Sequence, residues 1–63
     1  MGLRVRELRK ERDISQERLA QLAGVSFKTI ARVERTDSAS SRTLQRLADA
    51  LDVTVGELFG DAA

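Results

Sequence analysis

This 63-residue chain contains no Cys, His, Pro, Trp or Tyr. Without Cys no disulfide can form, and without Cys and His the usual ligands of a structural zinc are missing. A domain of this length is near the lower limit for folding without such cross-links. Its core must therefore come from packed apolar side chains alone, and a hydrophobic content of 41% is sufficient for a globular domain.

Long apolar runs are also missing. No stretch approaches the roughly 18 consecutive apolar residues that a membrane-spanning helix needs. The basic N-terminal residues are not followed by the apolar segment of a signal peptide. We therefore expect one soluble domain, residues 1–63, in the cytoplasm, with no role at a membrane.

Groups suited to catalysis are scarce as well. Besides His, Cys and Tyr, the chain lacks a glycine-rich phosphate loop. Its carboxylates fall on helix surfaces that we expect to face solvent, and so short a chain leaves little volume for a pocket. The sequence therefore predicts neither an enzyme nor a site for a metal, a cofactor or a small-molecule substrate.

Charge is distributed unevenly. Residues 1–48 hold all 11 Lys and Arg residues against six acids, a balance of +5, whereas residues 49–63 hold four acids and no base. A domain polarised in this way can turn a basic side to a polyanion. The plainer alternative is that interleaved Arg and Glu only form solvated helix faces with pairs four residues apart.

Apolar side chains recur at helical spacing in five segments, at about residues 2–12, 16–23, 27–35, 42–51 and 55–59. No segment alternates with a period of two. These patterns predict an all-α fold, a compact bundle of five short helices. The side chains expected to face inward are Val5, Leu8, Leu19, Ala20, Leu22, Ala23, Ile30, Val33, Glu34, Leu44, Leu47, Ala48, Leu51, Val55, Leu58 and Phe59.

The second and third segments are joined by a short break. Ser15 and Ser26 are suited to cap the N-termini of the two helices. Gly24 suits a left-handed C-terminal cap, and Ala20 lies where the helices would cross most closely. Two short helices at a steep angle, joined by a tight turn with Gly, are typical of the helix-turn-helix, whose second helix enters the DNA major groove. The outer face of that helix begins with Ser26, Phe27, Lys28, Thr29 and Arg32.

The chain resembles the DNA-binding domains of lambdoid phage repressors and Cro proteins, which are five-helix domains of bacterial and phage regulators. The resemblance is carried by SQERLA at 15–20, GVS at 24–26, IARVE at 30–34 and TLQRLADALDV at 43–53. It implies base contacts from Ser26, Phe27, Lys28 and Arg32. Arg and Lys suit guanine, and Phe27 can contact only an apolar group such as a thymine methyl. Open alternatives are packing of Phe27 on a neighbouring helix, phosphate contact by Lys28 and a surface ion pair of Arg32.

The same resemblance implies a second set of contacts, to DNA phosphates. These are assigned to Gln16, Arg35, Thr36, Ser38, Ser40, Ser41 and Arg42. Gln16 is also expected to support Phe27, and plain solvent exposure is the alternative for Arg42. Asp37 lies in the same loop and would repel phosphate unless it caps a backbone turn. A buried structural ion pair is implied between Arg9 and Glu34.

The resemblance further implies a homodimer on a palindromic operator in double-stranded DNA, because one short helix reads only a few base pairs. Dimer contacts are assigned to Val55, Leu58 and Phe59, for which burial in the core is the alternative. A second function stays open, that of a protein-interaction module such as an antitoxin-type partner using the same fold. Against it stands a balance of +3 over residues 26–46.

Overall fold

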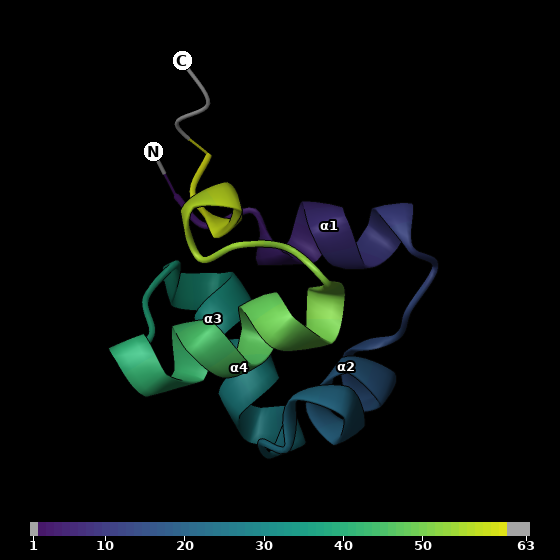
Figure 1. The fold of residues 1–63 in the computed structure, drawn as a ribbon. Helices are drawn as coiled ribbons and strands as arrows, with labels where there is room; N and C mark the ends of the chain where they lie inside the picture. The colour runs from purple at the N-terminus through teal and green to yellow at the C-terminus, as the bar shows by residue number, and fades with distance from the viewer. Residues whose placement is uncertain (1, 61–63) are drawn as a thin grey trace.

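A computed structural model describes residues 2–60 and shows four α-helices followed by one 3-10 turn (Figure 1). The helices are α1 (Val5–Glu11), α2 (Gln16–Ala23), α3 (Phe27–Thr36) and α4 (Ser41–Leu51), and the turn η1 is Gly56–Leu58. The predicted all-α class is thus confirmed. Met1 and residues 61–63 of the predicted domain lie outside the described residues. Within residues 2–60, no helix is both long enough and apolar enough to span a lipid bilayer.

Serine side chains set the starts of three helices. The hydroxyls of Ser15, Ser26 and Ser40 accept a hydrogen bond from the backbone N–H three residues further on, at 3.0, 3.1 and 3.2 Å. Each satisfies one of the N–H groups that a helix start leaves without a partner. Gly24 ends α2 with φ at 70°, a left-handed conformation that costs a residue without Cβ little. The predicted caps Ser15, Gly24 and Ser26 are confirmed.

The buried apolar side chains form one cluster to which all four helices and η1 contribute. Its members are Val5, Leu8, Leu19, Ala20, Ala23, Ile30, Val33, Leu47, Ala48, Leu51 and Leu58. The prediction of an inward-facing Leu22 was wrong, since this residue is 46% exposed. The helical turn places Leu22 beyond Leu19, on the side away from Ala20 and Ala23, where the core no longer covers it.

The fifth predicted helix, residues 55–59, is only the three-residue turn η1. Phe59 is extended instead, with φ at −87° and ψ at 143°, and forms an isolated antiparallel bridge with Leu3. The bridge is flanked by hydrogen bonds from the N–H of Arg4 to the Leu58 carbonyl and from the N–H of Gly60 to the Gly2 carbonyl. The same pairing holds residues 2–4 outside α1, which begins at Val5 and not near residue 2.

At the start of η1, the side chains of Thr54 and Glu57 each accept a hydrogen bond from the backbone N–H of the other residue. The Thr54 N–H donates to the Glu57 carboxylate at 2.8 Å, and the Glu57 N–H donates to the Thr54 hydroxyl at 3.1 Å. The hydrogen bond from the Thr54 backbone, aided by the one from its side chain, lowers the pKa of the Glu57 carboxyl below its usual value of 4.5.

The depressed pKa of Glu57 predicts a pH effect. A lowered folded-state pKa contributes stability above the unfolded-state value and loses it as the pH falls through the folded-state value. The difference in unfolding free energy between the wild type and Glu57→Gln should therefore shrink on acidification from neutral pH to about pH 3. Urea denaturation of both proteins at the two pH values measures it. A constant difference would contradict the effect.

Candidate nucleic-acid interface

The turn between α2 and α3 sets how the two helices pack. It comprises Gly24, Val25 and Ser26, and the Val25 N–H donates back to the Ala20 carbonyl at 3.0 Å. Ala20 is 5% exposed, and its small side chain lets the two helices lie against each other. This strand-free arrangement of two short helices around a tight Gly turn is the predicted helix-turn-helix unit.

Helix α3 has one buried and one exposed face. Ile30 and Val33 are 0% and 1% exposed and anchor it to the core. Lys28 and Arg32 are exposed on the opposite face, one helical turn apart, and Phe27 at the first position of α3 is 50% exposed. In the part of the chain that the structure describes, no carboxylate comes within ion-pair distance of Lys28 or Arg32. We call Phe27, Lys28 and Arg32 the reading face.

Ser26 stands at the start of the reading face but differs from the other three predicted base contacts. Its hydroxyl accepts the Thr29 N–H and lies 2.9 Å from the Thr29 hydroxyl. A hydroxyl has one donor and two acceptor positions, so these two contacts leave one position of Ser26 for a base. The structure thus gives Ser26 a clear role in starting α3.

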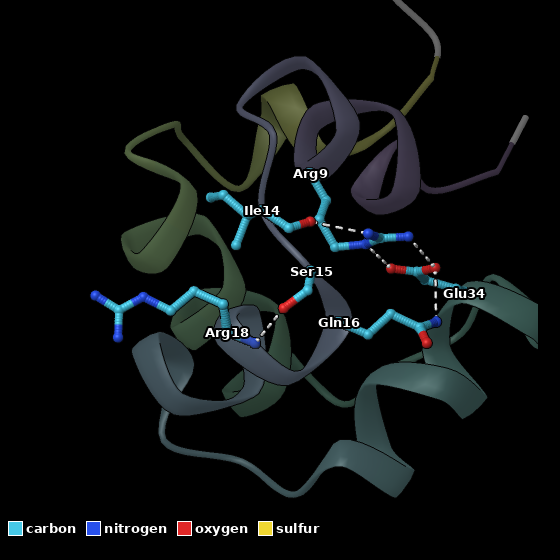
Figure 2. Close-up of polar contacts among 6 residues, drawn as sticks. All are labelled: Arg9, Ile14, Ser15, Gln16, Arg18 and Glu34. Carbon is cyan, nitrogen blue, oxygen red and sulfur yellow. Dashed lines mark hydrogen bonds and ion pairs between the residues drawn. The ribbon is translucent and has the colours of Figure 1, made fainter.

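An ion pair fixes α3 to α1 (Figure 2). The Arg9 guanidinium donates to both carboxylate oxygens of Glu34, at 2.7 and 3.2 Å, and to the Ile14 carbonyl at 2.9 Å. The Gln16 side-chain amide donates to Glu34 at 3.0 Å. The Arg9 and Glu34 side chains are 13% and 6% exposed. The network therefore joins α1, the start of α2 and α3 in largely buried surroundings.

The predicted phosphate contacts lie at two places. Gln16 is at the start of α2, where its side-chain amide donates to Glu34. The others follow the reading face along the chain and are exposed: Arg35, Thr36, Ser38, Ser40, Ser41 and Arg42. The Thr36 hydroxyl donates to the Arg32 carbonyl at 2.8 Å, and Ser40 caps α4. Ser41 and Arg42 occupy the first turn of α4, whose N–H groups have no partner within the helix and attract anions.

Asp37 does cap a backbone turn. It ends α3 in the left-handed conformation, with φ at 55°, and its N–H donates to the Val33 carbonyl at 2.8 Å. Its carboxylate packs so closely on Gly2 that a Cβ added there would lie 2.5 Å from a carboxylate oxygen. The acid in the loop is thus engaged with the N-terminal segment.

The three predicted dimer contacts have different surroundings. Leu58 is 0% exposed and belongs to the core, so its assignment as a dimer contact was wrong. Burial in the core, the alternative that the helical spacing favours for Leu58, is what the structure shows. Val55 is partly buried against the core. The prediction of an inward-facing Phe59 was wrong, since this residue is 46% exposed, and it is the one member of this group with a large accessible apolar surface.

A comparison with protein families shows the family of this chain. The sequence profile of the helix-turn-helix family matches residues 5–58. The chain belongs to the helix-turn-helix family. Within this domain, the match runs from the first residue of α1 to the last residue of η1.

This helix-turn-helix chain is also similar to known regulators. It is 36% identical over 62 residues to the immunity repressor protein of Bacillus phage phi105, covering 97% of this chain and 43% of that protein. The chain thus spans less than half the length of this relative. The restriction-modification controller protein C.AhdI of Aeromonas hydrophila is 42% identical, with a TM-score of 0.84 over 89% of this chain and 86% of that one.

A third similar protein is SinR of Bacillus subtilis. Its N-terminal DNA-binding domain is 31% identical, with a TM-score of 0.84 over 94% of this chain and 88% of that one. A crystal structure of SinR, the master regulator for biofilm formation, in complex with DNA is 33% identical. Its TM-score is 0.81 over 87% of this chain and 90% of the SinR chain.

Proposed function

We propose that this helix-turn-helix domain binds double-stranded DNA sequence-specifically and acts as the DNA-reading part of a transcriptional repressor in the cytoplasm. The observation that carries the proposal is the reading face. It consists of two cations and an exposed Phe on a helix whose other side is buried in the core. A phage repressor and a regulator solved in complex with DNA are among the similar proteins. No catalytic step is part of this function.

In this proposal α3 lies in the major groove with its N-terminal end deepest. Lys28 and Arg32 donate to guanine edges, and Phe27 contacts a thymine methyl. Phosphates are held on one side by Gln16. On the other side they are held by Arg35 and by the start of α4, where Arg42 and the free N–H groups of the first turn act together. The chain acts as a homodimer on a palindromic operator, with half-sites about one DNA turn apart.

Selection of bound sites from random duplexes tests this function. We expect a palindromic consensus whose half-site spacing gives the dimer geometry. Binding to unselected duplexes should weaken steeply with salt, with a logarithmic slope of about −0.9 for each phosphate contact. If neither an enriched site nor a salt-dependent complex is found, the proposal fails and the protein-interaction function takes its place.

A pair of substitutions separates base readers from phosphate contacts. Arg32→Ala should cost about 1–3 kcal/mol on the selected operator and relax preference at one base position. Arg42→Ala should weaken all sequences alike and make the salt slope shallower by about one phosphate contact. Titration of both variants with the operator and with single-base variants of it measures the two effects. Equal behaviour of the two variants would contradict the assignment of α3 as the reader.

A further inference from the structure

A cleft of about 480 Å³ opens beside the reading face, between α1, the start of α2 and α3. It is lined by Arg6, Arg9, Gln16, Ala31, Glu34 and Arg35. Five of these six side chains are polar or charged, so the cleft suits a hydrophilic ligand. The ion pair of Figure 2 forms part of its wall.

The charge of the cleft is positive. Arg9 and Glu34 neutralise each other at 2.7 Å. Arg6 and Arg35 are exposed, and no carboxylate of residues 2–60 lies within ion-pair distance of either. Two uncompensated guanidinium groups therefore lie at one cleft. Such planar forks match the oxygen geometry of phosphate better than an ammonium group does.

The other charges of α1 leave Arg6 available. The two acids of α1, Glu7 and Glu11, both come after Arg6 in the helix, and both lie 3.7 Å from Arg4. Four residues after Arg6 on the same helix face stands Lys10, a like charge that cannot pair with it. The arrangement holds the acids of α1 near Arg4 and keeps a cation at the cleft.

The cleft lies next to the reading face on α3. Ala31 and Arg35 follow Phe27 at steps of four residues, so these three residues form one stripe along α3. The cleft begins where this stripe meets α1. A duplex bound on the reading face brings the phosphates of one strand along that edge, where Gln16 also stands.

We infer that this cleft holds a backbone phosphate of the bound duplex, and that Arg6 on α1 is a phosphate-contacting residue together with Arg35. The inference rests on the proposed DNA binding and extends it to a helix outside the helix-turn-helix unit. Arg6 contributes affinity without sequence preference, since a phosphate is the same at every base pair.

The test measures DNA affinity as a function of salt for the wild type, Arg6→Ala, Arg6→Lys and Arg18→Ala. Arg18→Ala is the matched control, because it removes the same charge from an exposed side chain. Arg18 hydrogen-bonds Gln21 on its own helix at 3.3 Å and does not line the cleft. Fluorescence anisotropy with a random and a selected duplex gives the slope of log affinity against log salt.

We expect Arg6→Ala to make this slope shallower by about 0.9 and to weaken both duplexes by the same factor. Arg6→Lys, which keeps the charge, should retain the wild-type slope, and so should Arg18→Ala. A wild-type slope for Arg6→Ala overturns the inference while leaving the proposed function intact. A wild type that shows no salt-dependent binding overturns both.

A second experiment distinguishes a phosphate of DNA from free phosphate as the ligand of the cleft. The DNA-free protein is titrated with inorganic phosphate at constant ionic strength and followed by NMR chemical shifts of the residues that line the cleft. We expect no saturable shifts, because a single exposed phosphate is held far more weakly than a duplex with many contacts. Saturable shifts together with an unchanged DNA slope for Arg6→Ala would make the cleft a free-phosphate site and overturn the assignment.

Discussion

Arg9→Ala should lower the free energy of unfolding by about 3–5 kcal/mol. Among the described residues, the substitution leaves the Glu34 carboxylate, 6% exposed, with the Gln16 side-chain amide as its remaining donor. It also removes the donor from the Ile14 carbonyl. A chain of 63 residues has a total stability of roughly 3–9 kcal/mol. The loss is a large fraction of this total, so the variant should unfold at a much lower urea concentration than the wild type, as urea denaturation followed by circular dichroism will show.

Two further variants isolate the cause of this loss. Arg18→Ala removes an exposed Arg and should change stability by less than about 0.5 kcal/mol. Replacing both partners, Arg9→Met with Glu34→Leu, should recover most of the loss, because no buried charge is then stranded. A loss below about 1 kcal/mol for Arg9→Ala would mean that the pair behaves as a solvent-screened surface pair.

The Arg9–Glu34 ion pair also has a consequence for DNA binding. Glu34 lies on α3, two residues after Arg32 of the reading face, and Arg9 lies on α1. The pair therefore specifies the position of α3 against the rest of the domain more than it adds net stability. Since a hydrogen bond to a base fails when its donor is misplaced by about 1 Å, we infer that DNA affinity depends on this positioning.

Local features of the sequence were enough to predict α2, α3 and α4. Ser15, Ser26 and Gly24 mark the helix ends because each provides a cap within three residues of the chain, and such short-range interactions are visible in the sequence. The apolar spacing of α4 predicts its buried face in the same way. Leu22 shows the limit, because the width of the buried stripe depends on which neighbours cover α2.

Contacts between residues far apart in the chain could not be predicted from the local sequence pattern. The bridge between Leu3 and Phe59 joins the two ends of the described chain, and it is what shortens α1 and turns the predicted fifth helix into η1. The pairing of Arg9 with Glu34 was available only through the family resemblance. Arg6 was missed because the cleft is made by three elements and exists only after they pack.

The second large effect concerns the anchor of the reading face. Ile30 is 0% exposed and lies on the buried side of α3. Ile30→Ala should cost about 2–5 kcal/mol, from lost transfer free energy and from the cavity that remains beneath the helix. Ile30→Val is the matched control, since it removes one methyl group, and it should cost about 0.5–1.5 kcal/mol. Urea denaturation of the two variants measures both values.

The same two variants connect core packing to DNA binding. Neither touches the exposed side of α3, so both should keep the operator preference of the wild type. The apparent dissociation constant rises only in proportion to the loss of folded protein. Ile30→Val, which stays almost fully folded, should bind as the wild type does, whereas Ile30→Ala should bind more weakly by the factor that its folded fraction predicts. Anisotropy titrations measure the DNA affinity of each variant, and the denaturation curves give the folded fraction with which it is compared. If Ile30→Val changed the preferred bases, α3 would not be held in place by its buried face, and the separation of anchor and reader on this helix would be wrong.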